Sequence, residues 1–222
     1  MHWRFSTLQF VLIILLFVFL LTFVQMGLLS IAIEKLGLSM AQGMTLLFSS
    51  LLGSMLNLPL TTIKAEPPEV GLNTPDPRSM LRLPPLPFTG RTIIAINVGG
   101  CLVPLVFSAS LIYRFPFSVI ELVVAIILVS AICYFSSRPV AGFGIGMPPL
   151  VAPVAAALTA VMLNHELAAP LAYICGTLGV LFGADLLRMK DIGKLGAPIA
   201  SIGGAGTFDG IFLTGIVAVL LT

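Results

Sequence analysis

The stretch Gly176–Leu221, GTLGVLFGADLLRMKDIGKLGAPIASIGGAGTFDGIFLTGIVAVLL, holds the residues on which the interpretation of this chain depends. It consists of two apolar segments joined by a basic loop, and each segment carries one aspartate, Asp185 and Asp209. An ionisable side chain inside a membrane segment costs about 2.5–3.5 kcal/mol on insertion scales, so it is a functional-site hypothesis by default. Two such side chains that can lie close together make a more specific hypothesis, a site that uses both.

The composition is that of an integral membrane protein. Of the 222 residues, 58% are hydrophobic and 9% are charged, whereas a soluble domain carries about 25% charged residues. The net charge of +2 gives no reason to expect a nucleic-acid partner. Cys101, Cys133 and Cys175 lie in apolar runs without a second cysteine at metal-ligand spacing, so we expect buried cysteines and neither a metal nor a cofactor.

About 20 apolar residues per crossing predict an all-α, polytopic membrane protein with about seven transmembrane helices in a single domain, residues 1–222. The first, about Phe10–Ile33, is too long for the apolar region of a signal peptide and is expected to remain uncleaved. The other spans are predicted at about Ser39–Leu58, Thr92–Tyr113, Ser118–Phe135, Pro148–Leu163 and Leu167–Leu187, and in a segment that ends at Leu221. Ser39 is the predicted N-cap of the second span.

The basic residues predict the orientation of these spans. With seven spans, nine of the eleven Lys and Arg residues fall on the side of the N-terminus, and only Lys35 and Arg114 fall on the other side. Because positive residues stay inside, the N-terminus is expected in the cytoplasm and Thr222 outside, in a multi-pass protein of the cell membrane.

One connection has an unusual composition. Residues 59–91 contain eight of the sixteen prolines, and proline prevents a regular helix because it lacks an amide donor and clashes with the preceding turn. The segment is therefore expected as a Pro-rich loop on the cytoplasmic side. It is either a solvated linker or an extended element at the membrane surface that touches a partner or substrate.

The predicted orientation places both aspartates in the cytoplasmic half of the membrane. Asp185 lies three residues before Arg188 at the inner end of its span, and Asp209 lies 13 residues before the C-terminus, about 20 Å of helix. The glycines before Asp209, among them Gly204 and Gly206, indicate either close helix packing or unwound backbone that lines a wet cavity.

The segment Pro148-Pro149-Leu150 is predicted at the same depth, at the start of the fifth span. Adjacent prolines leave carbonyl groups without amide partners, and exposed backbone of this kind can bind an extended peptide. The alternative is an ordinary span with proline in its first turn. Pro148, Pro149, Leu150, Gly204 and Gly206 are the candidate substrate-binding residues.

Two carboxyl groups within hydrogen-bond reach share a proton, because both cannot ionise cheaply. One of them can then act as general base on a water molecule while the other protonates the scissile carbonyl. The roles belong to the pair rather than to either residue. Asp185 and Asp209 are therefore the candidate catalytic residues for peptide-bond hydrolysis without a metal or cofactor.

The motifs GAD (183–185), GTFDG (206–210) and PPL (148–150) resemble those of the GxGD-type intramembrane aspartyl proteases, presenilin and signal peptide peptidase. The resemblance implies cleavage of a transmembrane peptide substrate within the lipid. Here the second aspartate lies in Gly-Thr-Phe-Asp, and the proline motif precedes both aspartates instead of following them. The whole chain is also similar to an uncharacterised prokaryotic membrane-protein family, most strongly over 138–221.

Two other functions remain open at this stage. Intramembrane carboxylates beside glycine-broken helices also suit a proton- or cation-coupled transporter or channel. A non-catalytic membrane scaffold would instead pair the aspartates with Arg188, Lys190 or Thr207. In that case Asp185 would reach Arg188 three residues later on one helix face.

Overall fold

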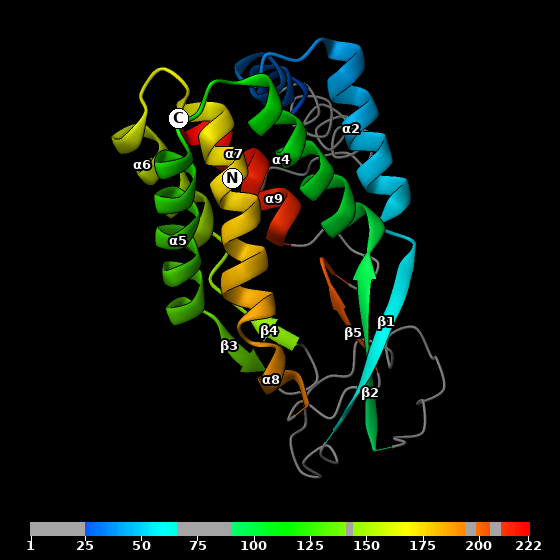
Figure 1. Ribbon diagram of the computed structural model, residues 1–222. Coiled ribbons are helices and arrows are strands. Elements are labelled where there is room, and N and C mark those ends of the chain that lie inside the picture. Colours follow the sequence, from blue (N-terminus) through cyan, green and yellow to red (C-terminus); the bar gives the residue numbers. More distant parts are fainter. Residues whose placement is uncertain (1–24, 66–89, 141–143, 194–198, 205–209) are drawn as a thin grey trace, which may run out of the picture.

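The computed structural model describes residues 25–65, 90–140, 144–193, 199–204 and 210–222 (Figure 1). The chain is mostly helical. Its helices are Gln25–Lys35, α2 (Met40–Gly53), the π-helix η1 (Val98–Leu102), α4 (Val103–Arg114), α5 (Val119–Ser136), α6 (Val151–Leu163), α7 (Ala168–Val180), the π-helix η2 (Leu181–Leu186), α8 (Met189–Ile192) and α9 (Gly210–Leu221). Its strands are β1 (Asn57–Lys64), β2 (Arg91–Asn97), β3 (Arg138–Val140), β4 (Gly144–Gly146) and β5 (Ile199–Ile202).

The central helix is α7, which contacts α4, α5, α6 and α9. Every residue of α7 except Ala169 is buried. Glycines on α7 let the neighbouring helices approach closely: a Cβ placed at Gly176 would lie 3.2 Å from the Cβ of Ala156, and one at Gly179 would lie 2.5 Å from the Cγ1 of Val129. Small residues at helix contacts are typical of membrane bundles, where packing rather than the hydrophobic effect drives helix association.

Several predicted helices are confirmed. Helix α5 starts after Ser118, whose amide donates to the Glu121 carboxylate at 3.0 Å and so begins the helix with a capping contact. Ser39 caps α2 as predicted, because its hydroxyl accepts from the amide of Gln42. Helix α6 and the continuous α7–η2 segment lie within the predicted fifth and sixth spans.

The all-α prediction is wrong in one respect, because a small sheet accompanies the helices. Strand β2 occupies Arg91–Asn97, where the third span was expected to begin, and α2 ends at Gly53 instead of continuing to Leu58. The run TIIAI is rich in β-branched residues, which favour strands. An apolar run of this length has the same hydropathy in a strand as in a helix, so hydropathy alone misassigned it.

The main sheet has the strand order β1-β2-β5. Strands β1 and β2 pair antiparallel from Asn57–Asn97 to Lys64–Arg91, with an irregularity after Pro59, and β5 pairs parallel to β2. Proline is tolerated in β1 because this strand lies at the edge of the sheet. The sheet thus joins the segments that follow the second and sixth predicted spans. It lies at the same end of the helices as β3, β4 and α8 (Figure 1).

The ends of the Pro-rich segment therefore contribute strands, whereas residues 66–89 lie outside the described residues. Whether the remainder is a linker or a membrane-surface element stays open.

Two of the described helices are long and apolar enough to cross a membrane alone, Val119–Ser136 and Ala168–Leu186. The pair Gln25–Lys35 and α2, bent by 110°, adds a third crossing if it forms one span. Shorter apolar helices comprise Val98–Arg114, Val151–Leu163 and Ile211–Leu221. Helix α5 exposes large apolar side chains along its length, including Ile120, Ile127 and Phe135, as expected of a surface that faces lipid. The count of seven spans stays a prediction.

Candidate functional site

Asp185 lies in the π-helix η2, which continues the central helix α7. In a π-helix each amide donates to the carbonyl five residues earlier instead of four. At the end of η2 the amide of Leu187 donates to the carbonyl of Phe182 at 3.0 Å. Single π-helical turns within α-helices occur frequently at functional sites. The structure therefore places Asp185 where the regular α-helical pattern of the central helix is broken.

The packing of η2 against α5 determines where Asp185 sits. A Cβ at Gly183 would clash with the carbonyl oxygen of Ser130 and would lie 2.8 Å from the Cβ of Cys133. Gly183 and Ala184 are buried, and Asp185 is half-buried. The turn that carries Asp185 thus packs directly against α5.

Arg188 follows one turn later and binds the end of α5. Its Nη2 donates to the carbonyl oxygens of Tyr134 at 2.8 Å and Ser137 at 2.9 Å, and its Cζ lies 4.3 Å from the centroid of the Tyr134 ring. A cation at a helix C-terminus satisfies free carbonyl groups and complements the helix dipole. Arg188 also pairs with Asp191 at 3.3 Å. In this ion pair Arg188 binds the aspartate three residues after it, Asp191, whereas the scaffold alternative would pair it with Asp185, three residues before it.

Asp209 and Gly206 lie outside the described residues, as does Thr207. The residues on either side are described. Gly203 and Gly204 have φ angles of 83° and 90°, values that favour glycine because it has no Cβ. A Cβ at Gly203 would lie 2.7 Å from the amide nitrogen of Cys101, so this part of the chain runs directly against η1.

Helix α9 begins at Gly210, the residue after Asp209, and runs antiparallel to α7 (Figure 1). A Cβ at Gly176 would lie 3.2 Å from Thr214, so these two residues are at the same height. Gly210 is four residues before Thr214 and Asp185 is nine residues after Gly176. At 1.5 Å per residue, the heights of Gly210 and Asp185 differ by about 7 Å along the axis. The start of α9 thus lies on the η2 side of the Gly176–Thr214 contact, and α9 also contacts η1.

The segment Pro148–Leu150 lies between β4 and α6 and lines a shallow apolar groove of about 640 Å³ together with Ile132 of α5. Cys133, the residue after Ile132, is fully buried and contacts Gly183. Successive helical residues point about 100° apart, so the groove and Asp185 lie on different faces of α5. The structure therefore places the proline segment and Asp185 on different faces of α5, and the segment that holds Asp209 lies outside the described residues.

Sequence reasoning did not identify the buried hydroxyl groups on α7. Tyr173 and Thr177 are fully buried, and both abut Gly215 of α9. Their spacing of four residues places them on one helix face. This spacing is the feature of the sequence from which the pair of hydroxyl groups could have been predicted. In the part of the chain that the structure describes, no three His, Cys, Asp or Glu side chains gather closely enough to hold a metal ion.

Residues 51–221 match the model of a family described as a protein of unknown function, DUF1614. This match covers more than half of the chain, so the chain belongs to the DUF1614 family, in agreement with the predicted similarity to an uncharacterised family. No curated protein and no solved structure matches the chain. None of these comparisons supports the resemblance to the GxGD proteases, which rests on the three short motifs alone.

Proposed function

We propose that this member of the DUF1614 family is a multi-pass protein of the cell membrane that hydrolyses peptide bonds of membrane-anchored substrates with Asp185 and Asp209. The observation that carries the proposal is the antiparallel packing of α9 on α7. This packing supports the proposal because the helix end that follows Asp209 and the π-helical turn that holds Asp185 both lie on the same side of the Gly176–Thr214 contact.

The proposed chemistry needs one shared proton. The ionised carboxylate removes a proton from water, the water oxygen attacks the carbonyl carbon, and the protonated carboxyl group delivers its proton to the carbonyl oxygen. The resulting diol collapses as the C–N bond breaks. The amine leaves with a proton from the protonated carboxyl group, and a diol hydroxyl gives its proton to the ionised carboxylate, so the pair again shares one proton. The individual role of each aspartate is not assigned, because a coupled pair titrates as a unit.

The substrate would first bind at the proline segment, on another face of α5 than Asp185, and would reach the carboxyl pair beside the glycine-rich segment. Pro148, Pro149 and Leu150 line an apolar groove, which suits the apolar side chains of a transmembrane peptide. Gly204 precedes the aspartate segment with a φ angle of 90°, and Gly206 follows it by two residues in the sequence. In the proposed orientation, with seven spans and the N-terminus inside, this site opens toward the cytoplasm.

A second candidate function is proton- or cation-coupled transport, with the same two carboxylates as the coupling groups. The irregular helix at Asp185 favours it, because broken helices with carboxylates also bind coupling ions in transporters.

One reconstitution experiment separates these functions and the scaffold alternative. The purified protein in liposomes is given a membrane-anchored reporter peptide, and in parallel a proton or cation gradient. Hydrolysis predicts cleavage that Asp185→Asn and Asp209→Asn each abolish, whereas Asp191→Asn, in helix α8, retains it. Flux that depends on the aspartates, without cleavage, would establish the transporter. The absence of both cleavage and flux would support the scaffold.

A further inference from the structure

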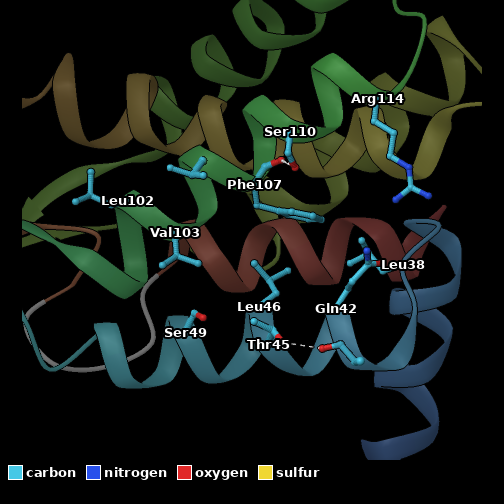
Figure 2. A pocket seen from close by; sticks show the side chains of 12 residues that line it. Leu38, Gln42, Thr45, Leu46, Ser49, Leu102, Val103, Phe107, Ser110 and Arg114 are labelled. Carbon is cyan, nitrogen blue, oxygen red and sulfur yellow. Dashed lines mark hydrogen bonds between the residues drawn. The ribbon is translucent and has the colours of Figure 1, made fainter.

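A groove between α2 and α4 takes no part in the proposed hydrolysis. Its volume is about 770 Å³, within the range of sites that bind small molecules. Figure 2 shows the two helices facing each other, with side chains from both turned into the space between them.

The middle of the groove is apolar. Leu46 of α2 and Val103 and Phe107 of α4 form its walls. Three hydroxyl groups also line it, those of Thr45, Ser49 and Ser110. Two of them donate within their own helices: Thr45 Oγ1 to the carbonyl of Ala41 at 2.8 Å, and Ser110 Oγ to the carbonyl of Phe107 at 2.7 Å. The protons of Thr45 and Ser110 are therefore not offered to a ligand, and the apolar walls of this part of the groove suit a hydrocarbon chain.

One end of the groove is polar and cationic. Arg114, the last residue of α4, lies there together with Gln42 (Figure 2). The Gln42 Oε1 accepts from the amide of Ser39 at 2.9 Å, so the NH2 group of the same side chain remains available as a donor. Among the described residues the ion pair that forms is Arg188–Asp191, and Arg114 is exposed without a carboxylate partner.

We propose that this groove binds an anionic phospholipid, with an acyl chain between α2 and α4 and the phosphate at Arg114 and Gln42. A guanidinium group binds phosphate through two parallel hydrogen bonds, and a single cation at the end of an apolar groove complements an amphiphile with one anionic head. A zwitterionic lipid offers the same chain with no net charge, so its affinity is lower.

The test uses the full-length protein in detergent, titrated with phosphatidylglycerol or phosphatidylcholine. Bound lipid is counted by native mass spectrometry, and the shift in Tm is followed in parallel. Phosphatidylglycerol is expected to bind more tightly, and Arg114→Gln to lower its affinity about tenfold without changing that of phosphatidylcholine. Arg138→Gln, which removes an exposed arginine elsewhere, should change neither.

A second pair of variants tests the apolar part. Val106→Trp fills the groove and should abolish lipid retention, whereas Ile120→Trp, at a similarly exposed position of α5, should retain it. Equal affinities for the two lipids, or an Arg114→Gln variant that binds like wild type, would overturn the proposal. It would also be overturned by a dimer that Val106→Trp disrupts, or by lipid binding that appears only after residues 1–24 are removed. Such a dimer would assign the groove to a second copy of the chain. Lipid binding only after the truncation would assign it to the chain's own N-terminal segment.

Discussion

Gly183 of η2 lies directly against the backbone carbonyl of Ser130 in α5. The obstructing atom belongs to the main chain, so a larger side chain cannot be accommodated by a change of rotamer. Because Asp185 follows two residues later, this contact fixes the rotation and height of the turn that carries the candidate catalytic carboxylate.

Gly183→Ala is predicted to destabilise the protein by about 1–3 kcal/mol, because the new methyl group overpacks the contact with Ser130. The measurement is the Tm of the purified protein in detergent. The matched control is Gly27→Ala in the helix Gln25–Lys35, where a Cβ would meet nothing within 4 Å. It should be neutral or stabilising, since alanine is the better helix former. Equal effects of the two variants would show that the Gly183 contact is not close.

Arg188→Gln is predicted to lower stability by about 1.5–3 kcal/mol, because charged hydrogen bonds to the carbonyl groups of Tyr134 and Ser137 are lost. Arg188→Lys should recover only part of this, since lysine lacks the planar fork and the stacking on the Tyr134 ring. Both are measured as shifts in Tm.

Asp191→Asn is the control for the Arg188 variants. It removes only the partly exposed ion pair, which is worth about 0–1 kcal/mol. A larger loss from Asp191→Asn than from Arg188→Gln would contradict the view that Arg188 acts chiefly as the cap of α5.

Asn97→Ala is predicted to destabilise the junction of sheet and helices. The buried Asn97 side chain accepts from the amide of Gly100 at 2.7 Å and donates to the carbonyl of Ser54 at 2.7 Å. Each buried group left without its partner costs about 1–3 kcal/mol. Asn164→Ala, which removes one partly buried bond to the amide of Leu167, should shift the Tm less, and the opposite order would contradict this role for Asn97.

The long apolar helices were predictable because their signals are local. The helix of Val119–Ser136 combines a capping residue, Ser118, with an uninterrupted apolar run, and both features are read directly from the chain. Asp185 could be singled out for the same reason, since a charge within an apolar segment stands out.

The strands and the π-helices were not predictable in this way. Strand β2 is stabilised by pairing with β1 and β5, which are distant in the sequence, so its apolar residues carry no local sign of the partner. The π-helical spacing at Leu181–Leu186 accompanies the close contact of Gly183 with α5, a tertiary effect. The partners of Arg188 on α5 likewise depend on packing between helices that the sequence does not encode locally.

The membrane orientation can be tested with single cysteines in a variant whose three native cysteines are replaced by alanine. Lys190→Cys, in the exposed segment after η2, should react with a membrane-impermeant maleimide only after the cells are permeabilised. Tyr113→Cys, whose native side chain is 95% exposed, should react in intact cells. Reaction of Lys190→Cys in intact cells would reverse the predicted orientation.

The central claim is that Asp185 and Asp209 form one pair, and the distance between their carboxyl oxygens tests it most directly. We would measure it in a cryo-electron microscopy map of the full-length protein in a lipid nanodisc. The account predicts that the two carboxyl groups lie within hydrogen-bond reach, directly or through one water molecule, and so are separated by no more than about 6 Å. A separation beyond about 10 Å, with an ordered helix from Gly203 to Gly210, would contradict it.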